Sequence, residues 1–196
     1  MKFKNFLKNS VKRIKMKKTF RILCAFVVAF LVSACGENYD FSLNSEFGKV
    51  SLKDFAGKKL IVYFGYTFCP DVCPATLALV SSELKSLEND KAYLLFISLD
   101  PERDSDINAT NEWLRYFYPN ATALIADDEK ALSQVAKRYG AIYEKVPLPN
   151  SAMIYSVAHS NELYLFDERG KFVEKINDFS QTNLHERLKN FLNSGK

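Results

Sequence analysis

Residues 60–74 have the sequence LIVYFGYTFCPDVCP. The first six residues form a continuous apolar run rich in β-branched and aromatic side chains, which is typical of a strand buried on both faces. Pro74 suits the first turn of a helix, and Leu77, Val80 and Leu84 then follow at helical spacing. The sequence therefore places two cysteines between a buried strand and the start of a helix.

Outward from this stretch, strands and helices alternate. We predict an N-terminal β-hairpin, a turn, four further strands and three further helices. The hairpin is formed by 41–43 and 49–52, and the turn by 54–58. The strands are 93–99, 121–126, 153–157 and 163–166, the last two turning through 160–162. The helices are 104–118, 128–139 and 184–192, with 141–151 as a loop. This order predicts an α/β layered domain, a central β-sheet flanked by helices.

The position of the two cysteines favours chemistry over packing. Backbone N–H groups and the helix dipole at a helix start favour negative charge, so we expect thiolates to form there more readily than on a free cysteine. Their spacing puts Cys69 and Cys73 about one helical turn apart, so the sulfurs can close on one metal ion or on each other. Two buried structural thiols are the less favoured alternative, because both cysteines adjoin prolines in an expected exposed turn.

The N-terminus carries a different kind of signal. Residues 1–36 hold nine of the 27 basic residues and no acid, which leaves 18 basic against 23 acidic residues in the remainder. An apolar run over 22–32, too short for an ordinary transmembrane helix, ends in the sequence VSAC at Cys35. This ending resembles a bacterial lipobox, which implies cleavage before Cys35 and acylation of its thiol. An uncleaved membrane anchor is the alternative, and either version tethers the domain.

The expected organisation is a lipoprotein signal and lipidation site over 1–35, a tether over 36–40 and one domain over 41–196. We expect Met16 to be the true start, because the segment from Met16 onward already resembles a complete signal. The acidic body argues against nucleic-acid binding. We expect a monomer attached by lipid to the bacterial cell membrane, facing the periplasm or the outer side.

Cysteine and histidine counts narrow the chemistry further. The chain has four cysteines, of which Cys24 leaves with the signal and Cys35 is lipidated, so Cys69 and Cys73 remain as thiols. Two thiolates with an imidazole suit Cu(I), and also hold Cu(II) or zinc. Of the two histidines, we expect His159 in a loop between strands, and His185 on the solvated face of the last helix, where it is a poor ligand candidate.

Three blocks of sequence resemble the Sco/SenC copper-chaperone family. They are 65–74, then 98–104 (SLDPERD), then His159-Ser160 followed by 164–167 (YLFD) and Gly170. The resemblance implies a thioredoxin-like fold in which Cys69, Cys73 and His159 bind copper. It also implies that the domain supplies copper to the binuclear copper site of cytochrome c oxidase, or keeps that site reduced. One departure is Ala158, where the family usually has an aspartate.

Two classes of function remain open at this point. A metallochaperone would hand copper to a respiratory oxidase subunit or another periplasmic copper protein. A thiol–disulfide oxidoreductase would instead cycle Cys69 and Cys73 as a redox-active pair. Dedicated thioredoxin-like reductants resemble one another in a proline before the strand that faces the cysteines, and no proline follows Pro149 here. This favours metal binding; copper or oxidative-stress defence remains a further alternative, and a peroxidase role a weaker one.

Overall fold

A computed structural model describes residues 38–88 and 91–194. The chain divides into two units, 1–38 and 39–196, and the second unit is described below. The predicted signal, the Met16 start, the lipidation of Cys35 and residues 36–37 of the tether lie outside the described residues. Among the helices of the described ranges, none is long and apolar enough to cross a membrane.

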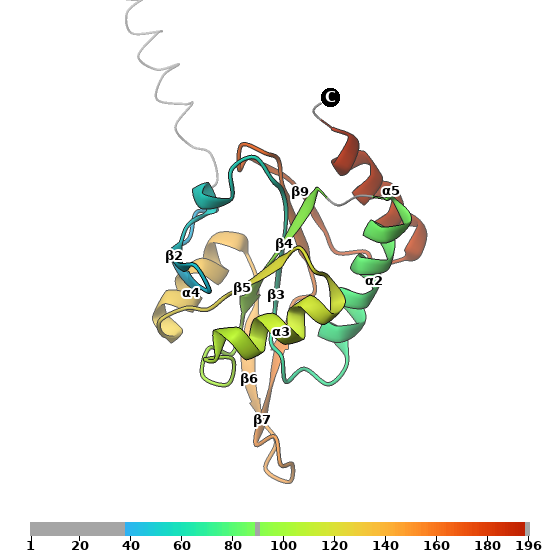
Figure 1. Cartoon of the computed structure of the whole chain (residues 1–196). Helices are drawn as coiled ribbons and strands as arrows, with labels where there is room; N and C mark the ends of the chain where they lie inside the picture. The colour runs from blue at the N-terminus through green and yellow to red at the C-terminus, as the bar shows by residue number, and fades with distance from the viewer. Residues whose placement is uncertain (1–37, 89–90, 195–196) are drawn as a thin grey trace, which may run out of the picture. The chain divides into compact units, whose positions relative to one another are not determined.

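A mixed five-stranded sheet forms the centre of the domain (Figure 1). Its strands, in spatial order, are β5 (Ala121–Leu124), β4 (Ala92–Ser98), β3 (Lys59–Gly65), β8 (Leu163–Phe166) and β9 (Phe172–Ile176). The strands β3, β4 and β5 are parallel, whereas β8 pairs antiparallel with both β3 and β9. Every residue of β3 is buried, as the apolar run predicts. Because β3 is the central strand, its carboxyl end and the cysteines that follow lie at the middle of one end of the sheet.

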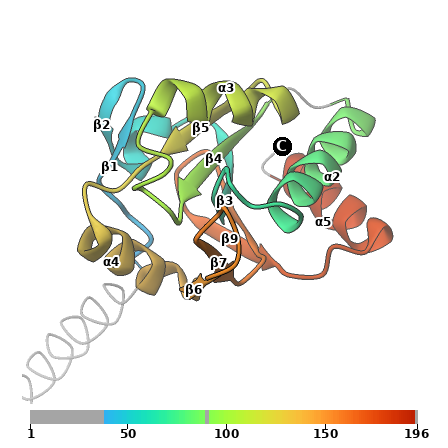
Figure 2. The same ribbon diagram turned by 90° about the horizontal axis from the view of Figure 1, so that it is seen from below.

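Helices cover both faces of this sheet (Figure 2). They are α2 (Val72–Ser86), α3 (Ile107–Phe117), α4 (Glu129–Tyr139) and α5 (Gln181–Asn193). Successive strand residues point to opposite faces. Accordingly Tyr63 shares a hydrogen-bond network with α2, while Phe64 meets the ring of Tyr139 in α4, with 5.1 Å between centroids. The alternation of β3 thus fixes α2 and α4 on opposite sides of the sheet.

Most expected elements are confirmed. The N-terminal hairpin consists of β1 (Leu43–Ser45) and β2 (Gly48–Val50), followed by a short 3-10 helix, η1 (Leu52–Phe55). The side chain of Asp128 accepts a hydrogen bond from the N–H of Ala131 at the start of α4. Gly140 ends the same helix with φ +68°, a conformation that glycine adopts without strain.

The segment before His159 differs from the prediction. The expected loop over 141–151 contains a strand, β6 (Tyr143–Pro147), which pairs antiparallel with β7 (Tyr155–His159) in a separate two-stranded ribbon. The predicted pairing of 153–157 with 163–166 is therefore wrong, because β8 joins the central sheet beside β3. The strand β9 was also missed. Four of the five β6 residues are exposed, so no hydrophobic alternation marks it.

Candidate metal centre

Three side chains from distant parts of the sequence converge at the carboxyl end of β3. Cys69 lies in the loop after β3, Cys73 in the first turn of α2, and His159 at the last position of β7. Their potential ligand atoms all lie within 4.8 Å of one another. Within the described ranges, this is the group of three or more His, Cys, Asp or Glu side chains close enough to share an ion. The three residues singled out from the sequence are thus brought together.

The close packing of Gly65 against Cys73 places the buried sulfur. A Cβ at position 65 would lie 3.1 Å from Cys73 Sγ and 2.9 Å from an atom of the Phe96 ring. Such contacts are tighter than van der Waals packing allows, so glycine lets the strand end and the sulfur approach each other. Cys73 is fully buried, and its backbone N–H donates to Cys69 Sγ across 3.3 Å. The two sulfurs therefore face the same small volume.

His159 is oriented by its own neighbour. Its Nδ1 lies 3.0 Å from the carbonyl oxygen of Ser160, and its Nε2 lies 3.3 Å from Cys73 Sγ. A carbonyl oxygen can only accept a hydrogen bond, so Nδ1 carries the hydrogen and Nε2 presents its lone pair to the sulfurs. Burial lowers the pKa of His159, which favours the neutral ring that metal binding requires. His159 was expected in a loop, but it is the last residue of the strand β7. The β6–β7 ribbon therefore holds its backbone in place.

The environment of Cys73 differs from the sequence expectation. The expected exposed turn is wrong for this residue, because its side chain is fully buried. Burial raises the pKa of Cys73 to about 12, and this effect outweighs the backbone hydrogen bond involving Tyr66 that lowers it. The predicted ease of thiolate formation is therefore wrong for Cys73 in the metal-free protein. A bound cation reverses this preference, because metal ligation expels the thiol proton.

A buried carboxylate braces the loop that carries Cys69. Asp104 is 1% exposed and accepts hydrogen bonds from Ser98 Oγ, across 2.6 Å, and from both the hydroxyl and the backbone N–H of Thr67. Ser98 ends β4, and Thr67 lies two residues before Cys69. Burial raises the pKa of Asp104 above its usual range, although these donors oppose the effect. Asp104 thus joins the second sequence block to the cysteine loop.

Arg103 joins the same block to the histidine ribbon. Its guanidinium bonds the buried carboxylate of Asp100, lies 3.8 Å from the centroid of the Tyr155 ring, and donates to the Tyr155 carbonyl. The Tyr155 hydroxyl in turn donates to Asp100 across 2.9 Å. The same guanidinium also lies over the ring of Phe68 in the cysteine loop, and its carbon is 5.1 Å from the ring centroid. The sequence marks 98–104 as a motif but does not predict this role. The feature of the sequence that could have indicated this role is the pair of Asp100 and Arg103 directly after a buried strand.

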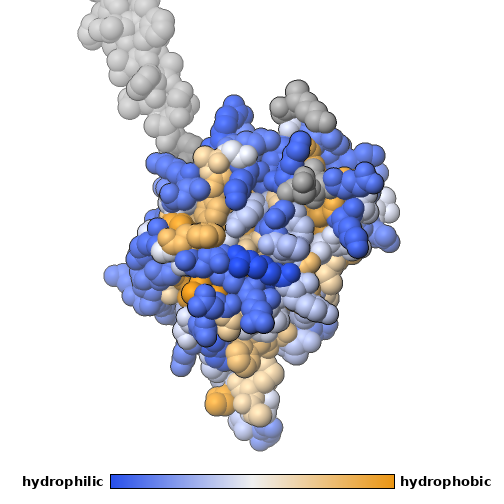
Figure 3. Space-filling model, viewed as in Figure 1, coloured by the Kyte–Doolittle hydropathy of each residue, from blue (hydrophilic) through white to orange (hydrophobic). Residues whose placement is uncertain are grey.

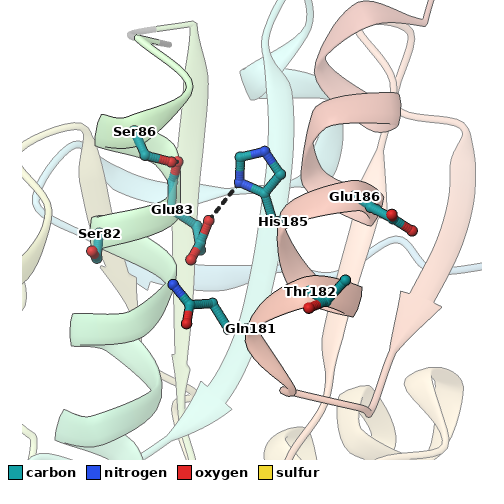
Figure 4. Close-up of a pocket in the computed structure, with 7 residues that line it drawn as sticks. All are labelled: Ser82, Glu83, Ser86, Gln181, Thr182, His185 and Glu186. Atoms are coloured by element: carbon teal, nitrogen blue, oxygen red, sulfur yellow. Dashed lines mark hydrogen bonds and ion pairs between the residues drawn. The ribbon is translucent and has the colours of Figure 1, made fainter.

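The second histidine lies elsewhere. His185 Nδ1 is 2.8 Å from the carboxylate of Glu83, a residue that is 5% exposed, and the two line a cleft of about 500 Å³ between α2 and α5 (Figure 4). His185 is not among the side chains that converge with the two cysteines. The ring lies on the last helix as expected, but it is only partly solvated, because it bridges two helices.

Exposed apolar side chains border the three potential ligands. Phe68 is 51% exposed and Val72 is 43% exposed, and they lie on either side of Cys69 and Pro70 in the sequence. Figure 3 shows further apolar surface over the projecting β6–β7 ribbon, to which Val146 and the neighbouring Ile154 contribute. Apolar surface of this kind around a site is typical of a surface that meets a partner.

Comparison with known proteins assigns the chain to a family. A family model described as SCO1/SenC matches residues 34–193. An SCO2-like protein of Rickettsia conorii is 31% identical over 155 residues, which is 77% of this chain and 75% of the relative. The mitochondrial SCO2 homologue of Bos taurus is 34% identical over 140 residues, which is 69% of this chain and 52% of that protein.

Solved structures show the same fold. ScoI of Arabidopsis thaliana with copper bound has a TM-score of 0.69 at 30% identity, covering 78% of this chain and 95% of the other. ScoI of Bradyrhizobium japonicum with copper bound has a TM-score of 0.64 at 33% identity, covering 78% and 98%. The expected thioredoxin-like fold of the Sco proteins is therefore confirmed. Because the family model matches nearly the whole described domain, together with the residues that converge at the end of β3, the chain belongs to the SCO1/SenC family.

Proposed function

We propose that this protein binds one copper ion through Cys69, Cys73 and His159, and delivers it to the copper-binding subunit of a respiratory cytochrome c oxidase during assembly. The observation that carries this proposal is the convergence of the three potential ligand atoms within 4.8 Å. The copper-bound ScoI structures of Arabidopsis thaliana and Bradyrhizobium japonicum support copper as the ion. The oxidase as acceptor rests on the family resemblance.

The donor set fits copper on chemical grounds. Two soft thiolates suit Cu(I), and the imidazole provides a third donor that stabilises Cu(II). The Nε2 of His159 already faces Cys73, and the Ser160 carbonyl fixes the tautomer that leaves this nitrogen unprotonated. Cys69 is only half-buried, so an acceptor can reach the cluster from its side. Transfer between proteins requires such an open side, because the incoming ligands must replace the outgoing ones.

Metal titration of the reduced protein tests the copper site. We expect one Cu(I) per chain with sulfur ligation. Cys69→Ser and Cys73→Ser should each abolish tight binding. His159→Ala should weaken Cu(II) binding more than Cu(I) binding, since two thiolates alone hold linear Cu(I). The matched control His185→Ala should leave both affinities unchanged, and a requirement for His185 in place of His159 would refute the assignment.

We further propose that a lipid on Cys35 attaches the domain to the outer side of the bacterial cell membrane. The VSAC sequence that ends at Cys35 supports this placement. The wild type should incorporate labelled palmitate and fractionate with membranes, whereas Cys35→Ser should not. A wild-type protein that takes up no label would contradict the lipoprotein assignment.

A thiol–disulfide oxidoreductase is the second candidate, favoured by the free and adjacent thiols of Cys69 and Cys73. In that reaction the dithiol gives two electrons and two protons to a disulfide of the acceptor and becomes a disulfide itself. A deletion strain separates the candidates. Rescue of oxidase activity by added copper supports delivery, and rescue by a small thiol but not by copper supports reduction. Normal oxidase activity with heightened sensitivity to copper or peroxide would instead support stress defence.

A further inference from the structure

We propose that the end of the domain opposite the three potential copper ligands lies against the anionic surface of the membrane. This inference rests on the lipid attachment proposed above. Lipidated Cys35 is four residues before Tyr39, and four extended residues reach at most about 14 Å. The position of Tyr39 in the domain therefore decides which surface the membrane can meet.

Tyr39 is fixed at the end of the sheet where β3 begins. Its ring stacks on Phe172 at 4.6 Å and meets the edges of Phe166 and Tyr139 at 5.4 and 5.0 Å. Phe166 pairs in register with Leu60, the second residue of β3. The cysteine loop follows the other end of this strand, which is seven residues or about 20 Å long. The tether thus keeps the Tyr39 end near the membrane, and the ligands reach it only if the domain lies on its side.

Charge distinguishes the two ends. Exposed basic side chains gather where Tyr39 lies, in η1, directly before β3 and β4, and in the β8–β9 turn: Lys53, Lys58, Lys91, Arg169 and Lys171. We call this set the basic end. The turn after η1 contacts the β8–β9 turn through a hydrogen bond from the N–H of Gly57 to the Glu168 carbonyl, across 2.7 Å. Because β3 and β4 are parallel, Lys58 and Lys91, which directly precede these strands, lie at the same end of the sheet.

The basic side chains of this end outnumber its acids. Glu168 lies 3.5 Å from the buried Lys59 and Asp167 bonds Arg169 at 2.7 Å, so these two pairs are close to neutral. Lys53, Lys58, Lys91 and Lys171 then outnumber the exposed acids Asp54 and Glu88. Around the carboxyl ends of the strands, in contrast, exposed acids prevail even though Asp127 and Glu102 pair with Lys49 and Lys145. The other acids there include Asp71, Asp128 and Glu144. An anionic lipid surface attracts the first end and repels the second. The geometry therefore holds the potential copper ligands about 20 Å or more from the bilayer, facing outward. An acceptor must then present its own copper site at about the same distance from the membrane surface.

Amine footprinting of the full lipidated chain in nanodiscs tests this orientation. A membrane-impermeant acylating reagent should label Lys53 and Lys171 about tenfold more slowly on phosphatidylglycerol than on phosphatidylcholine, and the difference should shrink in high salt. Lys130, exposed at the start of α4 beside the acidic end, should label equally on both lipids. Lys171→Glu should reduce the protection of Lys53, whereas the charge-matched Lys130→Glu should not.

Equal labelling of Lys53 and Lys171 on the two lipids, or protection of Lys130, would overturn the orientation. Recovery of the wild-type chain without lipid would overturn it too, because the tether would be absent. Cu(I) binding is measured with a competing chelator in the same nanodiscs. Lost protection with intact copper binding refutes this inference alone, and intact protection without copper binding refutes the copper function alone.

Discussion

At the scale of single residues, the two cysteines are chemically unequal although the sequence presents them as a symmetrical pair. Cys73 is fully buried beside Gly65, whereas Cys69 is half-buried in the loop. The sequence predicted both positions in the site, because their spacing and the adjoining strand are local features. It did not predict the burial of Cys73, since the packing of Phe96 and Tyr63 around Gly65 depends on strand neighbours.

Alkylation of the reduced, metal-free protein measures this inequality. Because the thiolate is the nucleophile and burial raises the pKa of Cys73 to about 12, Cys69 should react with iodoacetamide at least about tenfold faster at pH 8. Peptide mass spectrometry gives the two rates. In urea the rates should become equal. Equal rates in the folded protein would contradict the assigned burial of Cys73.

At the scale of elements, predictability followed the strength of local patterns. The strand β3 and the helix α4 carry a continuous apolar run and clear end signals, so both were predicted. The ribbon of β6 and β7 was not, because β6 is mostly exposed and its pairing is set by partners distant in sequence. The approach of His159 to the cysteines came from the family resemblance, since no local pattern relates residues 86 positions apart.

The brace between β4 and the cysteine loop should be required for copper binding. Asp104→Ala leaves the donors of Ser98 and Thr67 without their acceptor, so the free energy of unfolding should fall by about 2–3 kcal/mol. Cu(I) affinity should fall as well, because the loop carries Cys69. The control Asp106→Ala removes the N-terminal cap of α3, which should cost about 1 kcal/mol but leave copper affinity unchanged. Equal copper affinity in both variants would show that Asp104 only stabilises the fold.

The clamp between Arg103 and the ribbon should tune the metal site. Arg103→Lys cannot keep both the stack on Tyr155 and the bonds to Asp100 and the Tyr155 carbonyl. We expect Cu(II) affinity to fall about tenfold and the sulfur-to-copper absorption band to shift, with little change in Cu(I) affinity. Arg115→Lys, which loosens a bond to Glu46 on another part of the domain, is the matched control. An unchanged Cu(II) spectrum in Arg103→Lys would refute the positioning role.

At the scale of the whole molecule, one domain carries a metal site at one end and a basic surface at the other, with the sheet between them. The core that separates them includes tyrosines as well as aliphatic residues, and burial raises the pKa values of Tyr63, Tyr139 and Tyr164. These hydroxyls affect stability only when the unfolded chain loses tyrosine protons, near pH 10. Between pH 8.5 and 10, the buried thiol of Cys73 is therefore the group whose titration should most affect the free energy of unfolding.

Copper should change how stability depends on pH in this window. In the reduced, metal-free protein the folded pKa of Cys73 lies above that of an unfolded thiol, about 8.5, so the unfolded state releases its proton first. The contribution of this thiol is fully present below pH 8.5 and is lost as the pH rises towards 12, with a limiting slope of about 1.4 kcal/mol per pH unit. Cys73→Ser should remove this fall between pH 8.5 and 10.

The copper-loaded protein should behave differently. Its thiolates hold the metal and no proton, so stability should rise with pH up to about 8.5, as the unfolded thiols lose their protons, and then stay level. Urea unfolding at several pH values, followed by circular dichroism at fixed free Cu(I), measures both curves. A fall between pH 8.5 and 10 that is equally steep with and without copper would mean that Cys73 keeps its proton in the presence of the ion. Cys73 would then be no ligand, and the proposed site would reduce to Cys69 and His159.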